Sequence, residues 1–199
     1  MALTKQSSNV IYLSVSDGNI VRSYKEANAS TTQRVTKTGR LVHEERFKDL
    51  VAILEGAETK ENDFGKQWVL KFRDGEDFYM VNMPFSSRYS SSFLKALLNI
   101  DLSKNVKFMP WSMTDKNDAT KKVTGVTMYQ NDGNGFTKVA PAFTKDDPNG
   151  LPQMVQIKVK GKLEWDDSDM MEFLENVAKS CFAKTCTPEP TEPSDEVPF

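Results

Sequence analysis

Apolar and polar positions alternate along most of the first 160 residues, with turn residues between the alternating stretches, and this pattern predicts a mainly β body. Segments 9–15 and 19–24 flank Ser16-Asp17-Gly18. An Asp-Gly pair suits a tight hairpin because both positions tolerate positive φ. A third, more polar strand is predicted over 31–36. Together these strands form an N-terminal β extension within residues 1–40.

Segment 41–60 has two interpretations. Read as one long strand, it carries Gly56 where such a strand bends or bulges. Read as a helix over 44–55, it places Phe47, Leu50, Val51 and Leu54 on one face, and Gly56 ends it. We favour the strand.

The next segments give a characteristic element order. Residues 65–73 and 77–83 form a hairpin around Asp74-Gly75, and 86–100 form a helix with Tyr89, Phe93, Ala96, Leu97 and Ile100 on one face. Segments 105–111 and 121–130 are two further strands. The order strand, strand, strand, helix, strand, strand is that of the five-stranded OB barrel, although other α+β folds share it. We therefore predict a mainly β fold with an OB-fold core over 41–130.

The C-terminal part adds an arm and a helix to this core. A polar arm over 136–151 precedes a strand over 154–163 and a helix with one apolar stripe. The stripe consists of Met170, Phe173, Leu174, Val177 and Cys181. We treat 1–185 as one domain, with 131–185 as β arm and C-terminal helix, and 186–199 as a disordered acidic tail.

Composition excludes several classes of protein. The 199 residues hold two closely spaced cysteines and one histidine, too few for a disulfide scaffold or an ordinary zinc site. The acids Glu164, Asp166, Asp167 and Asp169 precede or open a helix, where capping explains them without a metal. No signal peptide or membrane span is recognisable. We expect a soluble, cytoplasmic protein without cofactors.

Charge is distributed unevenly along the chain. Residues 1–163 hold 24 bases and 18 acids, a net charge of +6, whereas residues 164–199 hold 2 bases and 10 acids, a net charge of −8. Such a division is typical of a body that meets a polyanion and a tail that can take the polyanion's place.

The last residues carry the most specific signal. Residues 187–199 read TPEPTEPSDEVPF, a segment too polar to bury a core. Asp195 and Glu196 supply charge before the compact apolar end Val197-Pro198-Phe199, whose ring lies beside the terminal carboxylate. This tip resembles that of bacterial and phage single-stranded DNA-binding proteins, and the whole chain is more similar to phage-encoded members than to the cellular form.

The resemblance implies a division of roles. A barrel would bind single-stranded DNA (ssDNA) without sequence preference and protect it during phage replication and recombination. The tip would recruit replication or recombination proteins such as a polymerase, helicase or primase, in the cytoplasm of the host cell. The chain lacks the long Gly/Gln-rich linker of the cellular form, so no oligomeric state is implied.

A single strand offers phosphates and unstacked bases, so its binding face needs cations interleaved with exposed rings. The candidate stacking residues are Trp68, Tyr79, Trp111 and Tyr129, because amphipathic rings tolerate a half-wet groove. The candidate phosphate ligands are Lys71, Arg73, Lys107, Lys121 and Lys122. RNA is not distinguished from DNA by these contacts.

Two other functions remain open. No phosphate-binding loop or nucleophile elbow is present, so we do not expect an enzyme. A metal-dependent nuclease needs only carboxylates and a lysine, which Asp63, Asp74, Glu76 and Asp77 could help to supply. The chain could also be a protein-interaction or virion component that binds no nucleic acid.

Overall fold

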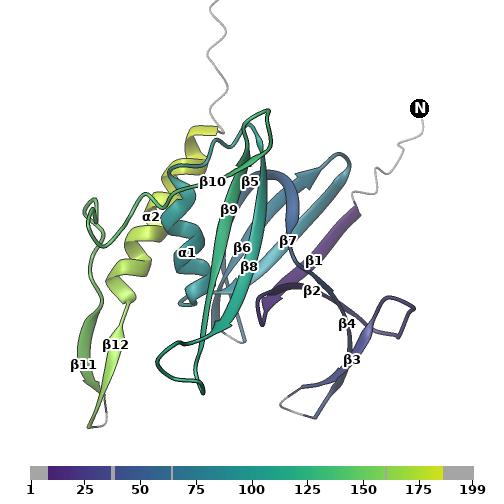
Figure 1. Ribbon diagram of the computed structural model, residues 1–199, viewed down its shortest axis with the longest axis horizontal. Helices are drawn as coiled ribbons and strands as arrows, with labels where there is room; N and C mark the ends of the chain where they lie inside the picture. The colour runs from purple at the N-terminus through teal and green to yellow at the C-terminus, as the bar shows by residue number, and fades with distance from the viewer. Residues whose placement is uncertain (1–8, 37–38, 64, 160, 186–199) are drawn as a thin grey trace, which may run out of the picture.

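The computed structural model describes residues 9–36, 39–63, 65–159 and 161–185, and within them the protein is mainly β (Figure 1). The strands are β1 (Asn9–Ser16), β2 (Asn19–Tyr24), β3 (Thr32–Val35), β4 (Leu41–Phe47), β5 (Leu50–Asn62), β6 (Gly65–Asp74), β7 (Asp77–Pro84), β8 (Asn105–Thr114), β9 (Lys122–Asn131), β10 (Phe136–Lys138), β11 (Val155–Val159) and β12 (Lys162–Asp166). The helices are α1 (Arg88–Leu97) and α2 (Ser168–Thr185). The acidic tip lies outside the described residues.

Ten strands form one sheet in the order β10-β9-β8-β5-β6-β7-β1-β2-β4-β3. Neighbouring strands are antiparallel except for β1 and β7, which are parallel. The prediction of a mainly β fold with three strands, a helix and two strands in its centre is confirmed. The described strands form no closed barrel. The edge of β7 that faces away from β6 pairs with β1, whereas closure of the barrel would require it to pair with β9.

The predicted Asp17-Gly18 turn connects β1 and β2, which are neighbours within this sheet. Asp17 and Gly18 have φ angles of 49° and 77°, as a tight primed turn requires. The Gly18 N–H donates to the Tyr89 hydroxyl of α1 at 2.9 Å. A Cβ at Gly18 would lie 2.5 Å from the backbone nitrogen of Ser112, so the turn packs directly on β8.

Segment 41–60 consists of two strands that belong to different parts of the sheet. Strand β4 pairs with β2 and β3, whereas β5 pairs with β6 and β8. The prediction of one continuous strand is wrong, since the chain leaves the sheet at residues 48–49, and the alternative helix over 44–55 is wrong as well. The predicted bulge is confirmed by a register shift between Leu54 and Gly56.

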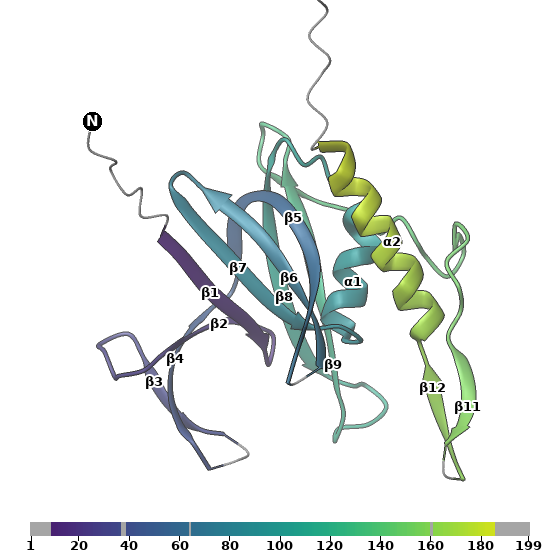
Figure 2. The ribbon, with the colours of Figure 1, turned by 180° about the vertical axis from the view of Figure 1, so that it is seen from behind.

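The core lies between one face of the sheet and the two helices (Figure 2). Alternate residues of β6 and β7 point into it, and α1 contributes Phe93, Leu94 and Leu97. Ser87 caps α1 by accepting from the Ser90 N–H at 3.1 Å, which satisfies one of the free amides of the first turn.

Helix α2 packs on this core through an ion pair as well as apolar side chains. Met170, Met171, Leu174 and Ala178 are buried, while the predicted stripe residues Phe173, Val177 and Cys181 are only half-buried. The carboxylate of Glu175, also buried, accepts from Lys66 Nζ at 2.5 Å and from Thr59 Oγ1 at 2.9 Å. These two bonds join α2 to β6 and β5.

The predicted strand over 154–163 is wrong, because this part of the chain forms the hairpin of β11 and β12. Gly161, at a φ of 85°, lies in its turn. Asp166 ends β12 and accepts from the Ser168 N–H at 3.0 Å, so this acid satisfies one of the free amides at the start of α2. In the described part of the chain, neither helix is long and apolar enough to cross a membrane.

Candidate nucleic-acid interface

The nine predicted contact residues of the body fall into two groups. Trp68, Lys71, Arg73 and Tyr79 lie on β6 and β7, and the other five lie on β8, β9 and the loop between them. Strand β5 separates the two groups in the sheet. In the second group only, two half-buried rings, Trp111 and Tyr129, share a face of the sheet with Lys107, a cation that has no ion-pair partner among the described residues.

Trp68 is a core residue. Its side chain is 1% exposed, and its ring stacks on that of Phe85 with centroids 5.9 Å apart. The expectation that Trp68 stacks on a base is therefore corrected. Its alternation with Leu70 and Phe72 places all three on the buried face of β6, and a strand cannot turn one of them outward without a register shift.

Tyr79 lies on the same face of the sheet as Trp68, and its side chain is half-buried. Burial, together with the nearby Asp77 carboxylate, raises the pKa of its hydroxyl. It lines a cavity of about 370 Å³ whose other walls are mainly apolar residues of β1, β2 and the β4–β5 turn, with Arg22 and Glu45 among them. Tyr79 is thus separated by the sheet from the outward-facing cations of β6.

Lys71 and Arg73 do point outward, but their charges are compensated. Lys71 Nζ lies 2.6 Å from a carboxylate oxygen of Glu58, and Arg73 forms an ion pair with Glu55. The hydrogen bond from Lys71 holds the pKa of Glu58 below its ordinary value. A phosphate would have to compete with these carboxylates for both cations.

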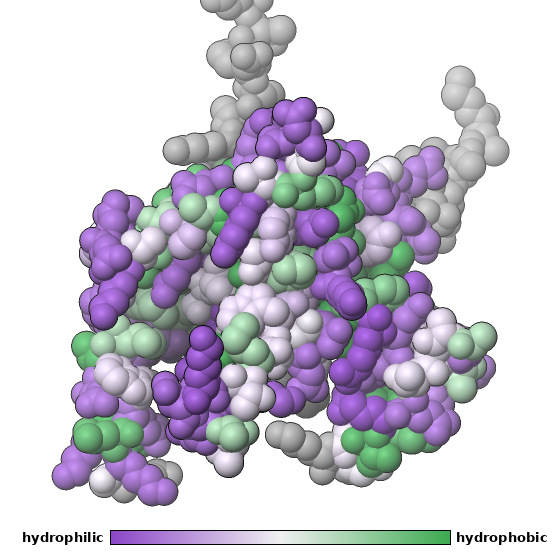
Figure 3. Space-filling model, in the orientation of Figure 1, coloured by the Kyte–Doolittle hydropathy of each residue, from purple (hydrophilic) through white to green (hydrophobic). Residues whose placement is uncertain are grey.

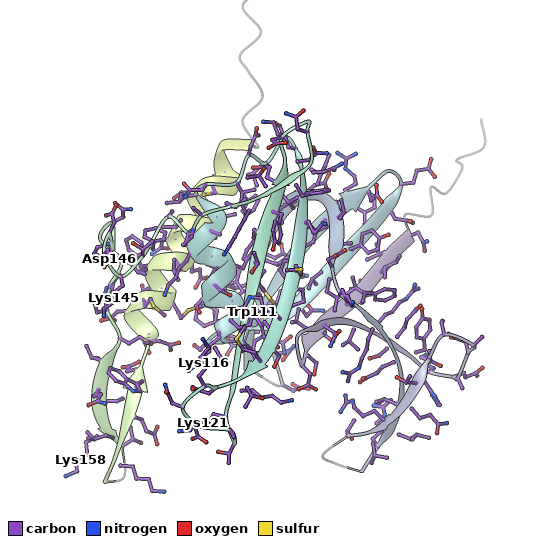
Figure 4. The ribbon with its side chains drawn as sticks, in the orientation of Figure 1. Trp111, Lys116, Lys121, Lys145, Asp146 and Lys158 are labelled. Carbon is purple, nitrogen blue, oxygen red and sulfur yellow. The ribbon has the colours of Figure 1, made fainter. Side chains whose placement is uncertain are left out.

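Trp111 forms a flat platform on the outward face of β8. It lies opposite Gly125 of β9, and a Cβ at Gly125 would come within 2.6 Å of the indole Cζ2 atom and 3.0 Å of Cε2. The indole therefore rests on the strand in the space that a larger side chain would fill. Figure 4 shows Trp111 on the side of β8 and β9 that faces the viewer, and Figure 3 shows the same face as a pale region bordered by hydrophilic side chains.

A row of cations and a ring crosses the sheet on the same face. Lys107 lies opposite Tyr129, and Tyr129 lies opposite Lys138 of β10, so the three side chains share one face of β8, β9 and β10. Lys107 lies four residues from Trp111 along β8, about 13 Å at the rise of a strand. Within the described residues, neither Lys107 nor Lys138 has an ion-pair partner.

Lys107 also contacts an aromatic ring. Its ammonium nitrogen lies 4.6 Å from the centroid of Phe136, the first residue of β10. A cation–π contact orients the ammonium without neutralising its charge. Lys107 is thus held in place and still available to an anion.

The loop from β8 to β9 and the first residue of β9 add exposed lysines. Lys121 pairs with Asp118 at 3.0 Å, and Lys122 reaches Asp17 of the β1–β2 turn at 3.3 Å. Hydrogen bonds from Thr120 and Lys121 lower the pKa of Asp118. The two lysines are 74% and 64% exposed, against 41% for Lys71 and 43% for Arg73, so their ion pairs are the weaker ones and phosphate can replace either carboxylate at lower cost. Figure 4 shows Lys116 and Lys121 on this loop, beyond Trp111.

We name the surface made of Trp111, Gly125, Lys107, Tyr129 and Lys138 the β8–β9 face. Gly125 and Lys138 were not among the residues predicted from the sequence. The turn-rich segment 131–135 was the available signal for Lys138, because a hairpin there returns residue 138 to a place beside Tyr129. Gly125 could not be recognised, since its role depends on the pairing of β8 with β9.

A metal centre finds no support in the described part of the chain, which holds no group of three or more His, Cys, Asp or Glu side chains that could bind an ion. Of the four candidate nuclease acids, Asp74 and Asp77 lie opposite each other at the β6–β7 turn.

The comparisons with known proteins add no family. No family model matches the sequence. Neither the curated proteins nor the solved structures include one that is significantly similar to it.

Proposed function

We propose that this protein binds single-stranded nucleic acid without sequence preference, and that the β8–β9 face holds the strand. The observation that carries the proposal is the indole of Trp111 lying flat over Gly125, on the same face of the sheet as a row of two lysines and a tyrosine. We expect the face of the ring turned away from Gly125 to stack on a base, since every base has a face that can stack. The lysines supply phosphate contacts that do not depend on sequence.

The order of the central strands supports an OB-type origin for this surface. Strands β5, β6 and β7, helix α1, and strands β8 and β9 follow one another as the elements of an OB-fold do, and β5 pairs with both β6 and β8. In OB-folds the face of the second and third strands and the loops between the first two and the last two strands bind oligonucleotides, and of these the proposed surface shares only the last loop. The corresponding loop here, residues 115–121, carries Lys116 and Lys121, and Lys122 follows as the first residue of β9.

The acidic tip supports the biological setting. Its resemblance to the tips of phage single-stranded DNA-binding proteins favours a role in protecting ssDNA during phage replication and recombination. In that role Asp195, Glu196, Val197, Pro198 and Phe199 would recruit a polymerase, helicase or primase. A free carboxylate beside an aromatic ring suits a partner pocket that contains a basic side chain.

The direct test compares three nucleic acids of equal length by electrophoretic mobility shift: oligothymidylate, duplex DNA and single-stranded RNA. We expect the single strands to bind more tightly than the duplex, because only unstacked bases reach the platform. Equal binding of duplex and single strands would contradict the role of the rings. Absence of binding to all three would refute the function and favour a protein-interaction component.

A further inference from the structure

The hairpin of β11 and β12 projects from the body of the protein. Its two strands pair with each other and with no other described strand. In Figures 1 and 2, β11 forms the outer side of the hairpin and its free edge points away from the large sheet. An isolated two-stranded hairpin is at best marginally stable in water, so this hairpin lacks the support that a third strand would give.

Large apolar side chains are unusually exposed on this hairpin. Met154, Val155, Ile157, Leu163 and Trp165 are between 39% and 69% exposed. Exposed apolar side chains that gather in one place mark an interaction surface.

The two faces of the hairpin differ. Val155, Ile157 and Val159 share one face with their partners on β12, and these partners are charged. Leu163 and Trp165 lie on the other face, opposite Lys158 and Gln156. The outer strand β11 therefore carries three aliphatic side chains on one face and a polar pair on the other.

The sequence of β11 is complementary to itself when two copies run antiparallel around Ile157. Val155 then lies opposite Val159 of the second copy, and Gln156 lies opposite Lys158. Six aliphatic side chains become contiguous on one face, and no like charges lie directly opposite each other. If the two copies paired around Lys158 instead, the two Lys158 ammonium groups would lie opposite each other. If one copy slipped by a single residue relative to the other, Ile157 would lie opposite Lys158, and the apolar and polar faces would mix.

We infer that β11 is a dimerisation strand, which pairs with β11 of a second copy of this chain to form a four-stranded sheet with two-fold symmetry. A free sheet edge supplies unpaired backbone groups for such an addition, and an isologous contact of this kind closes after two copies. Nucleic acid fits the aliphatic face less well, because two of its three cross-strand partners, Glu164 and Asp166, are acidic and would repel phosphate, while only Lys162 would attract it. The inference does not depend on the proposed function.

Sedimentation equilibrium of the full chain from about 1 to 100 µM tests the inference. We expect a reversible monomer–dimer equilibrium. The variant Gln156→Lys places two lysines opposite each other at two equivalent positions, and should raise the dimer dissociation constant about 2- to 30-fold. The double variant Gln156→Lys/Lys158→Glu replaces that repulsion with attraction and should restore dimerisation. Restoration cannot result from misfolding.

Gln33→Lys is the matched control, since it makes the same change at an exposed position of edge strand β3 and should leave the dimer unchanged. The inference is overturned if the wild-type protein is monomeric throughout this range. It is equally overturned if the dimer is insensitive to Gln156→Lys or is not restored by the double variant. A monomer whose oligonucleotide affinity rises with Gln156→Lys would assign the hairpin to nucleic acid instead.

Discussion

The contact between the Trp111 indole and Gly125 can be removed without changing the tryptophan itself. In Gly125→Ala, the new methyl group would begin 2.6 Å from indole Cζ2, whereas ordinary contact begins at 3.4 Å. The edge of the ring must therefore retreat by about 0.8 Å (3.4 − 2.6), and it can do so because it is the far end of a side chain. The fold should persist, while the ring no longer lies flat on the strand.

The expected loss of affinity follows from the value of one stacked base. Stacking contributes about 1–3 kcal/mol per base, so removal of Trp111 should raise the Kd for oligothymidylate about 5- to 150-fold. Trp111→Ala sets this upper limit, and Gly125→Ala should fall between the limit and the wild-type value. Fluorescence anisotropy with a labelled oligonucleotide measures all three Kd values, and thermal melts check folding.

Gly56→Ala provides the matched control. This glycine also lies in a strand, but a Cβ there would meet Lys71 Cδ at 3.6 Å, an ordinary contact. Gly56→Ala should bind like the wild-type protein. If Gly125→Ala also binds like the wild-type protein while Trp111→Ala binds more weakly, the flat position of the indole over Gly125 does not contribute to the affinity. If Trp111→Ala binds like the wild-type protein, the Trp111 ring does not stack on a base.

Three further predictions concern charge. With four to six phosphate contacts, a plot of log K against log salt should have a slope of about −3 to −4, and Lys107→Gln/Lys138→Gln should reduce its magnitude by about 1.4. Lys71→Gln should change the slope little, since that ammonium is already paired, and an equal effect in both variants would contradict the assignment. Deletion of Ser194–Phe199 should strengthen ssDNA binding at low salt and abolish capture of replication proteins, whereas unchanged affinity with retained capture would refute the competition. In Glu175, burial raises the pKa of the carboxyl, but hydrogen bonds from two lysines and a threonine outweigh it and lower the pKa below 4.5. Its stabilising effect is thus complete above pH 4.5 and is lost as the pH falls through the lowered value, so Glu175→Gln should cost about 1–2 kcal/mol in urea unfolding at pH 7 and less at pH 3.

Local patterns predicted the elements of the fold well. The alternation of Trp68, Leu70 and Phe72 with Gln67, Lys71 and Arg73 indicates β6 even though Val69 interrupts it, and the Asp-Gly pairs indicate two turns, because these signals depend only on neighbouring residues. The parallel pairing of β1 with β7 could not be predicted, since it joins strands more than 60 residues apart and prevents β7 from closing a barrel with β9.

The residues of the β8–β9 face were also predicted only in part, because local signals do not show which strands pair or which face is buried. Trp111, Tyr129 and Lys107 share a face because they alternate correctly along paired strands. Trp68 failed as a candidate because residue type alone does not say which face of a strand is buried. The distribution of charge along the sequence also does not reveal the ion pairs that compensate Lys71 and Arg73, because their acidic partners lie on the neighbouring strand β5.

Ultraviolet crosslinking of the full-length protein to oligothymidylate tests most directly whether the β8–β9 face holds the strand. After tryptic digestion, mass spectrometry identifies the peptides that carry a crosslinked nucleotide. We predict crosslinks in peptides 108–116 and 123–138, which contain Trp111 and Tyr129. Crosslinks confined to other peptides, such as the one that contains Trp165, would contradict the account.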